Sequence, residues 1–404
     1  MVNYTLIAGH VAGGGAVDFA LTKDHEAIRD AVRELCAQFP DAYWRELDRQ
    51  KAYPDAFVAA LTESGWLSAL IPAEFGGAGL GISEAAAILE EINHSGGNAA
   101  SAHAQMYTMA TLLKYGSREQ KCRYLPPIAR GEVRLQAFGV TEPDAGSETT
   151  RIQTTAVRHG SDWVINGQKV FISRAQHSDL MLLLARTTAF QQLTDKTRGL
   201  SVFVVDLKQA VAAGQMTIQP IAAMVNHHTT AIYMQDLVVP DENLIGVEGG
   251  GFRQIIDSWN AERILVASEA LGDGRWFINR ASMYASQRVV FGRQIGANQG
   301  VQFPIAQAHA SVEAATLMRD KAAWLFDADR KCGPEANMAK LLASQAAWAA
   351  ANAAMDTHGG YGFATEFDIE RKFRETRLLS IAPISNNLVL AYVGNKVLGM
   401  PRSY

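Results

Sequence analysis

A stretch of small and polar residues has the composition of a ligand-binding loop. Residues 138–147 read Phe-Gly-Val-Thr-Glu-Pro-Asp-Ala-Gly-Ser. Pro143 fixes φ, Gly146 tolerates unusual backbone angles, and Ser147 offers a hydroxyl where backbone amides point outward. The main chain of such a loop can bind a polar or anionic ligand. Pro-Asp-Ala-Gly is also a common surface turn, and turn chemistry alone favours that simpler interpretation.

A second segment, residues 165–173, combines an aromatic ring with a hydroxyl. Its Asn166-Gly167 pair predicts a β-hairpin turn. Phe171 and Ser173 lie two residues apart and therefore on the same side of a strand. They are either a packing residue and an internally bonded hydroxyl, or a platform and hydrogen-bond partner for an aromatic cofactor.

One carboxylate lies on an otherwise apolar helical stripe. Glu262 shares this stripe with Ile255, Trp259 and Val266. A desolvated carboxylate there would have a raised pKa, which suits a catalytic acid or base. The alternative is an exposed glutamate at the edge of the stripe, or one paired with Arg263, and periodicity alone favours this alternative.

Helices are predicted to precede these segments. Residues 28, 32, 35 and 36 are apolar, with the spacing of one helical face. Ser83 is a predicted N-cap, and Ser117 with Gln120 forms a capping-box pattern.

From residue 136 to 236 the pattern is that of antiparallel strands. Turn residues separate short apolar runs, with no room for crossover helices. These runs are Thr155–Val157, Trp163–Ile165, Leu180–Ala185, Leu200–Val205 and Ala231–Met234.

Alanine-rich helical texture returns after residue 252 and predicts a tight bundle. The expected fold class is therefore α+β. A flexible N-terminal extension (1–16) precedes an all-α domain (17–135), a β-barrel or sandwich domain (136–250) and a C-terminal helical bundle (251–404).

Bulk properties exclude several classes of protein. The 404 residues include 48% hydrophobic and 19% charged residues, which is ordinary globular composition. The net charge of -4 and the absence of a basic stripe in the sequence give no reason to expect a nucleic-acid partner. We expect no membrane span and no secretory signal, and three scattered cysteines indicate a cytoplasmic protein. His227 and His228 would point to opposite faces of a strand, so we expect no metal site.

Together these segments resemble the acyl-CoA dehydrogenase family from about Val17 to Gly399. The resemblance is carried by four sets of residues: 138–147, 165–173, the Arg-x-x-Phe-Gly element at 288–292, and Gly-Gly-Tyr-Gly-Phe at 359–363 followed by Glu366, Glu370, Arg371 and Arg374.

This resemblance implies a noncovalently bound FAD. Thr141 and Ser173 match hydroxyls at the polar edge of the flavin, with the backbone of Val140 and Ile172 nearby. Phe171 stands where most members carry tryptophan, so ring stacking is kept but the indole donor is lost. Ser147 matches the serine at the pyrophosphate and the substrate's pantetheine. The residues Phe138 and Gly146 complete this first cofactor set.

A second cofactor set would reach the dinucleotide of a neighbouring subunit, which implies a homotetramer. It consists of Arg288, Phe291, Gln299, Gly359 and Gly360. Asp356 replaces the family's usual glutamine at an adenosine contact. Ser385 and Asn387 match polar positions on the adenosine side.

The family's usual catalytic base is missing near the C-terminus, where Pro383 occupies its position. Isovaleryl-CoA and long-chain acyl-CoA dehydrogenases instead carry their base in a Glu-Arg pair, which Glu262 and Arg263 match. The resemblance therefore implies that Glu262 is the base and that Arg263 lies near the CoA pantetheine or the flavin edge. Pro383 lacks the N–H that the family uses to bind the thioester carbonyl. Three alternatives follow. The backbone N–H of Ile384 would donate to the thioester carbonyl instead, a ribityl hydroxyl of the flavin would contribute more of the hydrogen bonding to that carbonyl, or the acyl group would bind in a different way.

The expected function is α,β-dehydrogenation of an acyl-CoA, with an electron-transferring flavoprotein as acceptor. The alternatives are a changed reaction or carrier (an oxidase, a desulfinase or a carrier-protein-bound substrate) and a non-enzymatic binding protein.

Overall fold

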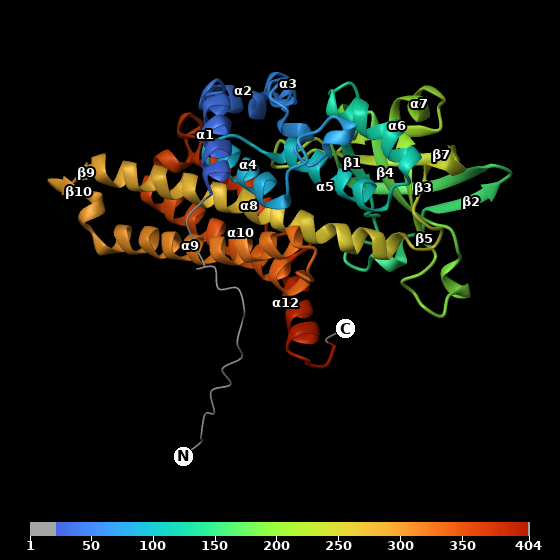
Figure 1. Ribbon diagram of the computed structural model, residues 1–404. Coiled ribbons are helices and arrows are strands. Elements are labelled where there is room, and N and C mark those ends of the chain that lie inside the picture. Colours follow the sequence, from blue (N-terminus) through green and yellow to red (C-terminus); the bar gives the residue numbers. More distant parts are fainter. Residues whose placement is uncertain (1–21, 403–404) are drawn as a thin grey trace, which may run out of the picture.

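The computed structural model describes residues 22–402 (Figure 1). The extension expected at 1–16 and the domain start at residue 17 lie outside the described residues. In the described range no helix is both long and apolar enough to cross a bilayer.

Six helices form the first part of the chain. Their bounds are α1 Lys23–Ala37, α2 Asp41–Gln50, α3 Asp55–Glu63, α4 Ile82–His94, α5 Ala100–Tyr115 and α6 Arg118–Ala129. The predicted apolar face of α1 is confirmed, since Val32, Leu35 and Cys36 are buried. The capping box at Ser117 is also confirmed. The cap predicted at Ser83 is wrong, because α4 begins at Ile82, two residues before the predicted start at Glu84. The carboxylate of Asp327, distant in sequence, accepts from the first N–H groups of the helix.

The middle of the chain forms an eight-stranded sheet in the order β6-β7-β3-β2-β4-β5-β8, with β1 paired to β4. The strands are β1 Leu135–Gly139, β2 Thr155–His159, β3 Asp162–Ser173, β4 Leu180–Arg186, β5 Leu200–Asp206, β6 Met216–Pro220, β7 Thr229–Pro240 and β8 Leu244–Ile245. The sheet is mixed rather than purely antiparallel, because β4 pairs in parallel with β1 and with the start of β2. A short helix, α7 (Leu207–Ala212), connects β5 to β6.

The hairpin predicted at Asn166-Gly167 is wrong. Both residues lie inside β3, and the turn between β2 and β3 is at Gly160, whose φ is 63°. The pairing of β3 with β7 shifts register between Ile165 and Gly167. A side chain at Gly167 would overlap Thr154, so this glycine permits a close approach of two backbones rather than a turn.

The last third of the chain is a bundle of long helices joined by a small hairpin at one end. The elements are α8 Gly251–Gln287, β9 Val289–Val290, β10 Arg293–Gln294, α9 Gln299–Asp327, α10 Gly333–His358, α11 Ile369–Leu378 and α12 Asn386–Tyr392. Figure 1 shows α8, α9 and α10 running side by side, with α8 extending from the sheet at one end to the β9–β10 hairpin at the other.

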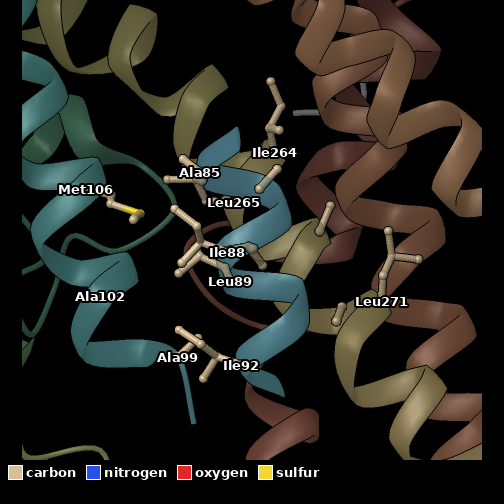
Figure 2. Close-up of a cluster of buried hydrophobic side chains, with 14 of the residues drawn as sticks. Ala85, Ile88, Leu89, Ile92, Ala99, Ala102, Met106, Ile264, Leu265 and Leu271 are labelled. Atoms are coloured by element: carbon tan, nitrogen blue, oxygen red, sulfur yellow. The ribbon is translucent and has the colours of Figure 1, made fainter. Parts of the chain in front are cut away.

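Helix α8 also packs against the N-terminal helices and so joins the parts of the molecule. Ile88, Leu89 and Ile92 of α4 lie in one buried cluster with Ile264 and Leu265 of α8 (Figure 2). The two helices approach so closely that a side chain at Gly272 would overlap the carbonyl oxygen of Glu90. This crossing holds the middle of α8, including Glu262, in a fixed position against α4 and α5.

Candidate active site

Glu262 is buried in the middle of α8, with 5% of its surface exposed. Burial raises the pKa of its carboxyl to about 7, although the charges of His103 and Arg263 oppose this shift. Its Oε2 atom has no hydrogen-bond partner within residues 22–402. Arg263 donates instead to Asn260 Oδ1 at 3.2 Å. The structure therefore contradicts the alternatives of an exposed or an Arg263-paired carboxylate.

His103 and Tyr107 of α5 lie close enough to this carboxylate to interact with its charge. Burial first, and then the charge of Glu262, raise the pKa of Tyr107. The Tyr107 ring stacks against Phe138 at the end of β1, with 6.4 Å between ring centroids. Phe138, from the first predicted cofactor segment, is thereby brought close to the proposed base.

The structure brings the two predicted flavin segments together. The backbone N–H of Val170 donates to the carbonyl oxygen of Thr141 at 2.9 Å, which places the loop after β1 beside the end of β3. The pairing of β3 with β7 shifts register again before Ile172, and Phe171 has a φ of 58°. The regular alternation predicted for Phe171 and Ser173 therefore does not hold at this point.

A buried ion pair fixes the position of this loop. Lys169 Nζ lies 2.8 Å from Glu142 Oε1 and donates to the carbonyl oxygen of Val140 at 3.0 Å. Glu142 also accepts from the backbone N–H groups of Gln153 and Thr154. We did not predict this pair from the sequence. The available signal was a lysine inside a strand whose neighbours are mostly apolar.

The exposed groups of these two segments fit a flat, polar-edged cofactor. The hydroxyls of Thr141, Ser147 and Ser173 make no hydrogen bond to any residue in the described part of the chain. Phe171 presents 66% of its surface although its neighbour Ile172 is buried. Free hydroxyls beside an open aromatic face match the donors and stacking surface that a flavin requires.

The second predicted cofactor set lies elsewhere on the surface. It occupies the β9–β10 hairpin, the start of α9 and the end of α10, and Phe291 is fully exposed there. The ring of Tyr284 at the end of α8 stacks on His358 at the end of α10 and joins these parts. This set is far from the first set along α8, as Figure 1 shows, which agrees with the idea that it serves another subunit. The members of the set are Arg288, Phe291, Gln299, Gly359 and Gly360, and Asp356 lies beside them near the end of α10.

The segment that contains Pro383 is held by a buried lysine. Lys340 Nζ donates to the carbonyl oxygen of Ile384 at 2.7 Å and to Asn386 Oδ1 at 2.9 Å. Burial, and then Arg263, lower the pKa of Lys340 to about 8. Ser385 caps α12 by accepting from Leu388 N, and Asn387 is exposed. Sequence reasoning missed Lys340, although a lone lysine in an alanine-rich helix was a signal.

His227 and His228 lie in the loop before β7, not on a strand. His227 Nδ1 is 3.3 Å from Arg174 Nη2, and His228 Nδ1 is 3.2 Å from His177 Nε2. The expectation of no metal site at these two histidines rested on strand geometry that the structure does not have, and the two side chains contact different partners.

Comparison with known proteins covers nearly the whole chain. The acyl-CoA dehydrogenase N-terminal, middle and C-terminal domain models match residues 22–132, 137–237 and 249–393. Acyl-CoA dehydrogenase FadE12 of Mycobacterium tuberculosis is 35% identical over 391 residues, which is 96% of this chain and 99% of that protein. A 3-(aryl)acrylate reductase of Clostridium sporogenes is 33% identical, covering 89% of this chain and 94% of its own length.

The fold is also that of solved members of this family. The glutaryl-coenzyme A dehydrogenase glutaryl-CoA complex superposes with a TM-score of 0.88 at 30% identity, over 96% of this chain and 98% of that one. The predicted fold class and the predicted cofactor, FAD, are thereby confirmed. The matches span all three parts of the chain, and the chain belongs to the acyl-CoA dehydrogenase family of FAD-dependent enzymes.

Proposed function

We propose that this enzyme oxidises an acyl-CoA to the 2-enoyl-CoA, with Glu262 taking the proton from the α carbon. The observation that carries the proposal is the environment of Glu262. Its carboxylate is buried, one oxygen has no partner within the described residues, and its pKa of about 7 lies near physiological pH. A base with such a pKa combines a useful ionised fraction with enough basicity to remove an α proton.

The first cofactor set is proposed to hold FAD against the substrate. Thr141 and Ser173 would donate to the polar edge of the flavin, with Val140 and Ile172 providing backbone contacts and Phe171 stacking. FAD, when bound, accepts the hydride that leaves the β carbon. Phe138 and the loop from Gly146 to Ser147 would complete the binding surface, with Ser147 shared between the FAD pyrophosphate and the CoA pantetheine.

Arg263 is proposed to contact the CoA pantetheine. It is buried, its Nε atom has no partner within residues 22–402, and its only side-chain hydrogen bond there goes to Asn260. A buried guanidinium with unused donors is costly unless a ligand completes its hydrogen bonds.

Ile384 is proposed as the donor to the thioester carbonyl in place of Pro383. Its backbone N–H has no acceptor in the described part of the chain, while Lys340 binds its carbonyl oxygen and holds the peptide in place. Donors that are fixed before the reaction stabilise the negative charge that develops on the carbonyl oxygen.

The second cofactor set supports a homotetramer, in which Arg288, Phe291, Gln299, Gly359 and Gly360 reach the FAD of a neighbouring subunit and Asp356 faces its adenosine. The full exposure of the Phe291 ring is unusual for a large apolar side chain and favours burial against another copy. Ser385 and Asn387 are proposed to lie on the adenosine side. An electron-transferring flavoprotein is the proposed acceptor.

The direct test is anaerobic mixing of the FAD-loaded protein with a panel of straight and branched acyl-CoAs. Loss of the oxidised flavin's visible absorbance with some members of the panel would support the proposal. A yellow protein that none of them bleaches would contradict it. Peroxide release during aerobic turnover would instead identify an oxidase.

The rate of flavin reduction is expected to increase about tenfold between pH 6 and pH 8. Only ionised Glu262 can accept the α proton, and with a pKa of about 7 its ionised fraction grows through this range. Stopped-flow reduction at acyl-CoA concentrations well below saturation, where the rate reports the free enzyme, measures the effect, with bound FAD quantified at each pH as the control. A rate that is constant over this range would show that Glu262 is not the titrating base.

A further inference from the structure

Arg174 is a buried arginine without an acidic partner. It follows β3, and only 4% of its surface is exposed. Its Nε atom has no hydrogen-bond partner, and no carboxylate of residues 22–402 lies within ion-pair distance of it. Its Nη2 atom contacts His227 Nδ1 at 3.3 Å. Burial, and then the charge of Arg174, hold the pKa of His227 well below its usual value, so this contact is with a neutral imidazole.

Among the other buried arginines of residues 22–402, Arg186, Arg319 and Arg371 are satisfied, whereas Arg263, like Arg174, has an unused Nε atom. Arg319 contacts Glu90 at 2.7 Å, and Arg371 contacts Glu375 at 3.1 Å. Arg186 donates to the carbonyl oxygens of Ile152 and Thr150. A buried guanidinium with unused donors costs several kcal/mol, so the unused Nε of Arg174 indicates that something else completes its hydrogen bonds.

Further polar groups surround Arg174. His103 Nδ1 lies 2.6 Å from Glu269 Oε1, while His103 Nε2 has no partner in the described part of the chain. Burial lowers the pKa of Arg174, whereas Tyr53, Glu269 and Tyr107 act in the opposite direction, and His227, which contacts Arg174, lines a pocket together with Glu269. We call Arg174, His103, Tyr107 and Glu269 the polar cluster.

The polar cluster lies next to the proposed base and extends away from it. Tyr107 is close enough to Glu262 for the carboxylate to influence its pKa. Glu269 is seven residues beyond Glu262 on the same helix, which is about 10 Å along its axis and nearly on the same face. His103 and Tyr107 are one turn apart on α5. His103 contacts Glu269 and its charge acts on Glu262, whereas Tyr107 lies near Glu262. The cluster therefore lies where the distal part of an acyl chain would extend from Glu262.

The cluster also borders empty space. Glu269 and His227 line one small pocket, and Arg174 with His228 lines a second one that shares Asn98 and Asn226 with the first. The side of the polar cluster formed by Arg174 and Glu269 therefore borders open space with charged and polar side chains rather than a closed apolar wall.

The composition of the cluster selects among acyl groups. A hydrocarbon chain would leave the Nε atom of Arg174 and the Nε2 atom of His103 without partners, which is costly in a buried site. A terminal carboxylate would accept from Arg174 but would be repelled by Glu269. A hydroxyl both accepts from Arg174 and donates to Glu269, and a carbonyl accepts without adding charge.

We propose that the preferred substrate carries an uncharged oxygen function, a hydroxyl or a carbonyl, in the distal part of its acyl chain, where Arg174 donates a hydrogen bond to it. This inference rests on the proposed function, because it assigns the acyl group that is dehydrogenated beside Glu262.

The test compares three acyl-CoAs of equal length under anaerobic conditions: octanoyl-CoA, 8-hydroxyoctanoyl-CoA and the mono-CoA thioester of octanedioic acid, with the six-carbon series in parallel. We expect kcat/KM for the hydroxyacyl-CoA to exceed that for the alkyl form by about tenfold or more, as for one hydrogen bond to a charged group. Equal values, or a preference for the alkyl or carboxyl form in both series, would overturn the inference and leave the proposed function intact. No flavin reduction by any acyl-CoA would overturn both.

Arg174→Met tests the role of the side chain itself. The ratio of kcat/KM for hydroxyacyl-CoA to that for alkyl-CoA is expected to fall close to one. Arg158→Met, which changes an exposed arginine at the end of β2, is the matched control and should keep the wild-type ratio. An unchanged ratio in folded, FAD-loaded Arg174→Met would overturn the assignment. If this variant does not fold, the comparison of the three acyl-CoAs with the wild-type enzyme still tests the inference.

Discussion

Replacing Glu262 with glutamine is expected to leave FAD bound and to slow flavin reduction by acyl-CoA by roughly a thousandfold or more, within the range attributed to a general base. Glutamine has nearly the same shape but cannot accept the α proton. The side chain is buried and its pKa is raised by desolvation, so the ionised form is costly to the folded protein. The substitution should therefore not reduce stability above pH 7. Stopped-flow flavin absorbance measures the rate, and the visible spectrum of the purified variant measures bound FAD.

Glu262→Asp is the control that keeps the charge. Aspartate retains a carboxylate but withdraws it from the α carbon, so its rate should lie between those of the wild type and Glu262→Gln. Reduction of Glu262→Gln at the wild-type rate would show that the base is another residue. A colourless variant would show that Glu262 is needed for FAD binding rather than for proton transfer.

The second large effect is expected from Lys169→Met, which should lower the free energy of unfolding by about 3–5 kcal/mol. Lys169 is fully buried and contacts Glu142 at 2.8 Å. Methionine fills a similar volume but leaves the Glu142 carboxylate buried without its cation. Because Lys169 also binds the carbonyl oxygen of Val140, the loop that carries Thr141 should move, and FAD should dissociate more readily. Urea unfolding and FAD retention on gel filtration measure the two effects.

The double variant Glu142→Gln/Lys169→Met separates charge from packing. Removing both charges eliminates the unpaired carboxylate, so the double variant should recover more than half of the stability lost in Lys169→Met. If the single and double variants are equally unstable, the loss comes from packing and not from an uncompensated charge.

Two features that depend on local sequence, the buried face of α1 and the cap of α6, were predicted correctly. The apolar spacing of Val32, Leu35 and Cys36 predicts a buried helical face, because the helix repeat alone determines which side chains share a side. The Ser117 cap was predicted for the same reason, since its partner is only three residues away. The motifs around Thr141 and Gly359 were sufficient to identify the family and FAD.

Only the tertiary structure decided features that depend on distant neighbours. Asn166-Gly167 has the local signature of a turn, but Thr154 and β7 pack against it and keep it in a strand. The parallel pairing of β1 with β4 likewise depends on where two separated segments meet.

The chemistry of the site divides in the same way. Sequence resemblance identified Glu262 as the candidate base, whereas its burial depends on α5 and on the crossing of α4 and α8. The pairing of Lys169 with Glu142, the contact of Lys340 with Ile384 and the missing acidic partner of Arg174 follow from packing between distant segments. Desolvation and pairing depend on these neighbours in space, so residue order determined which groups are present and the fold determined their protonation and their partners.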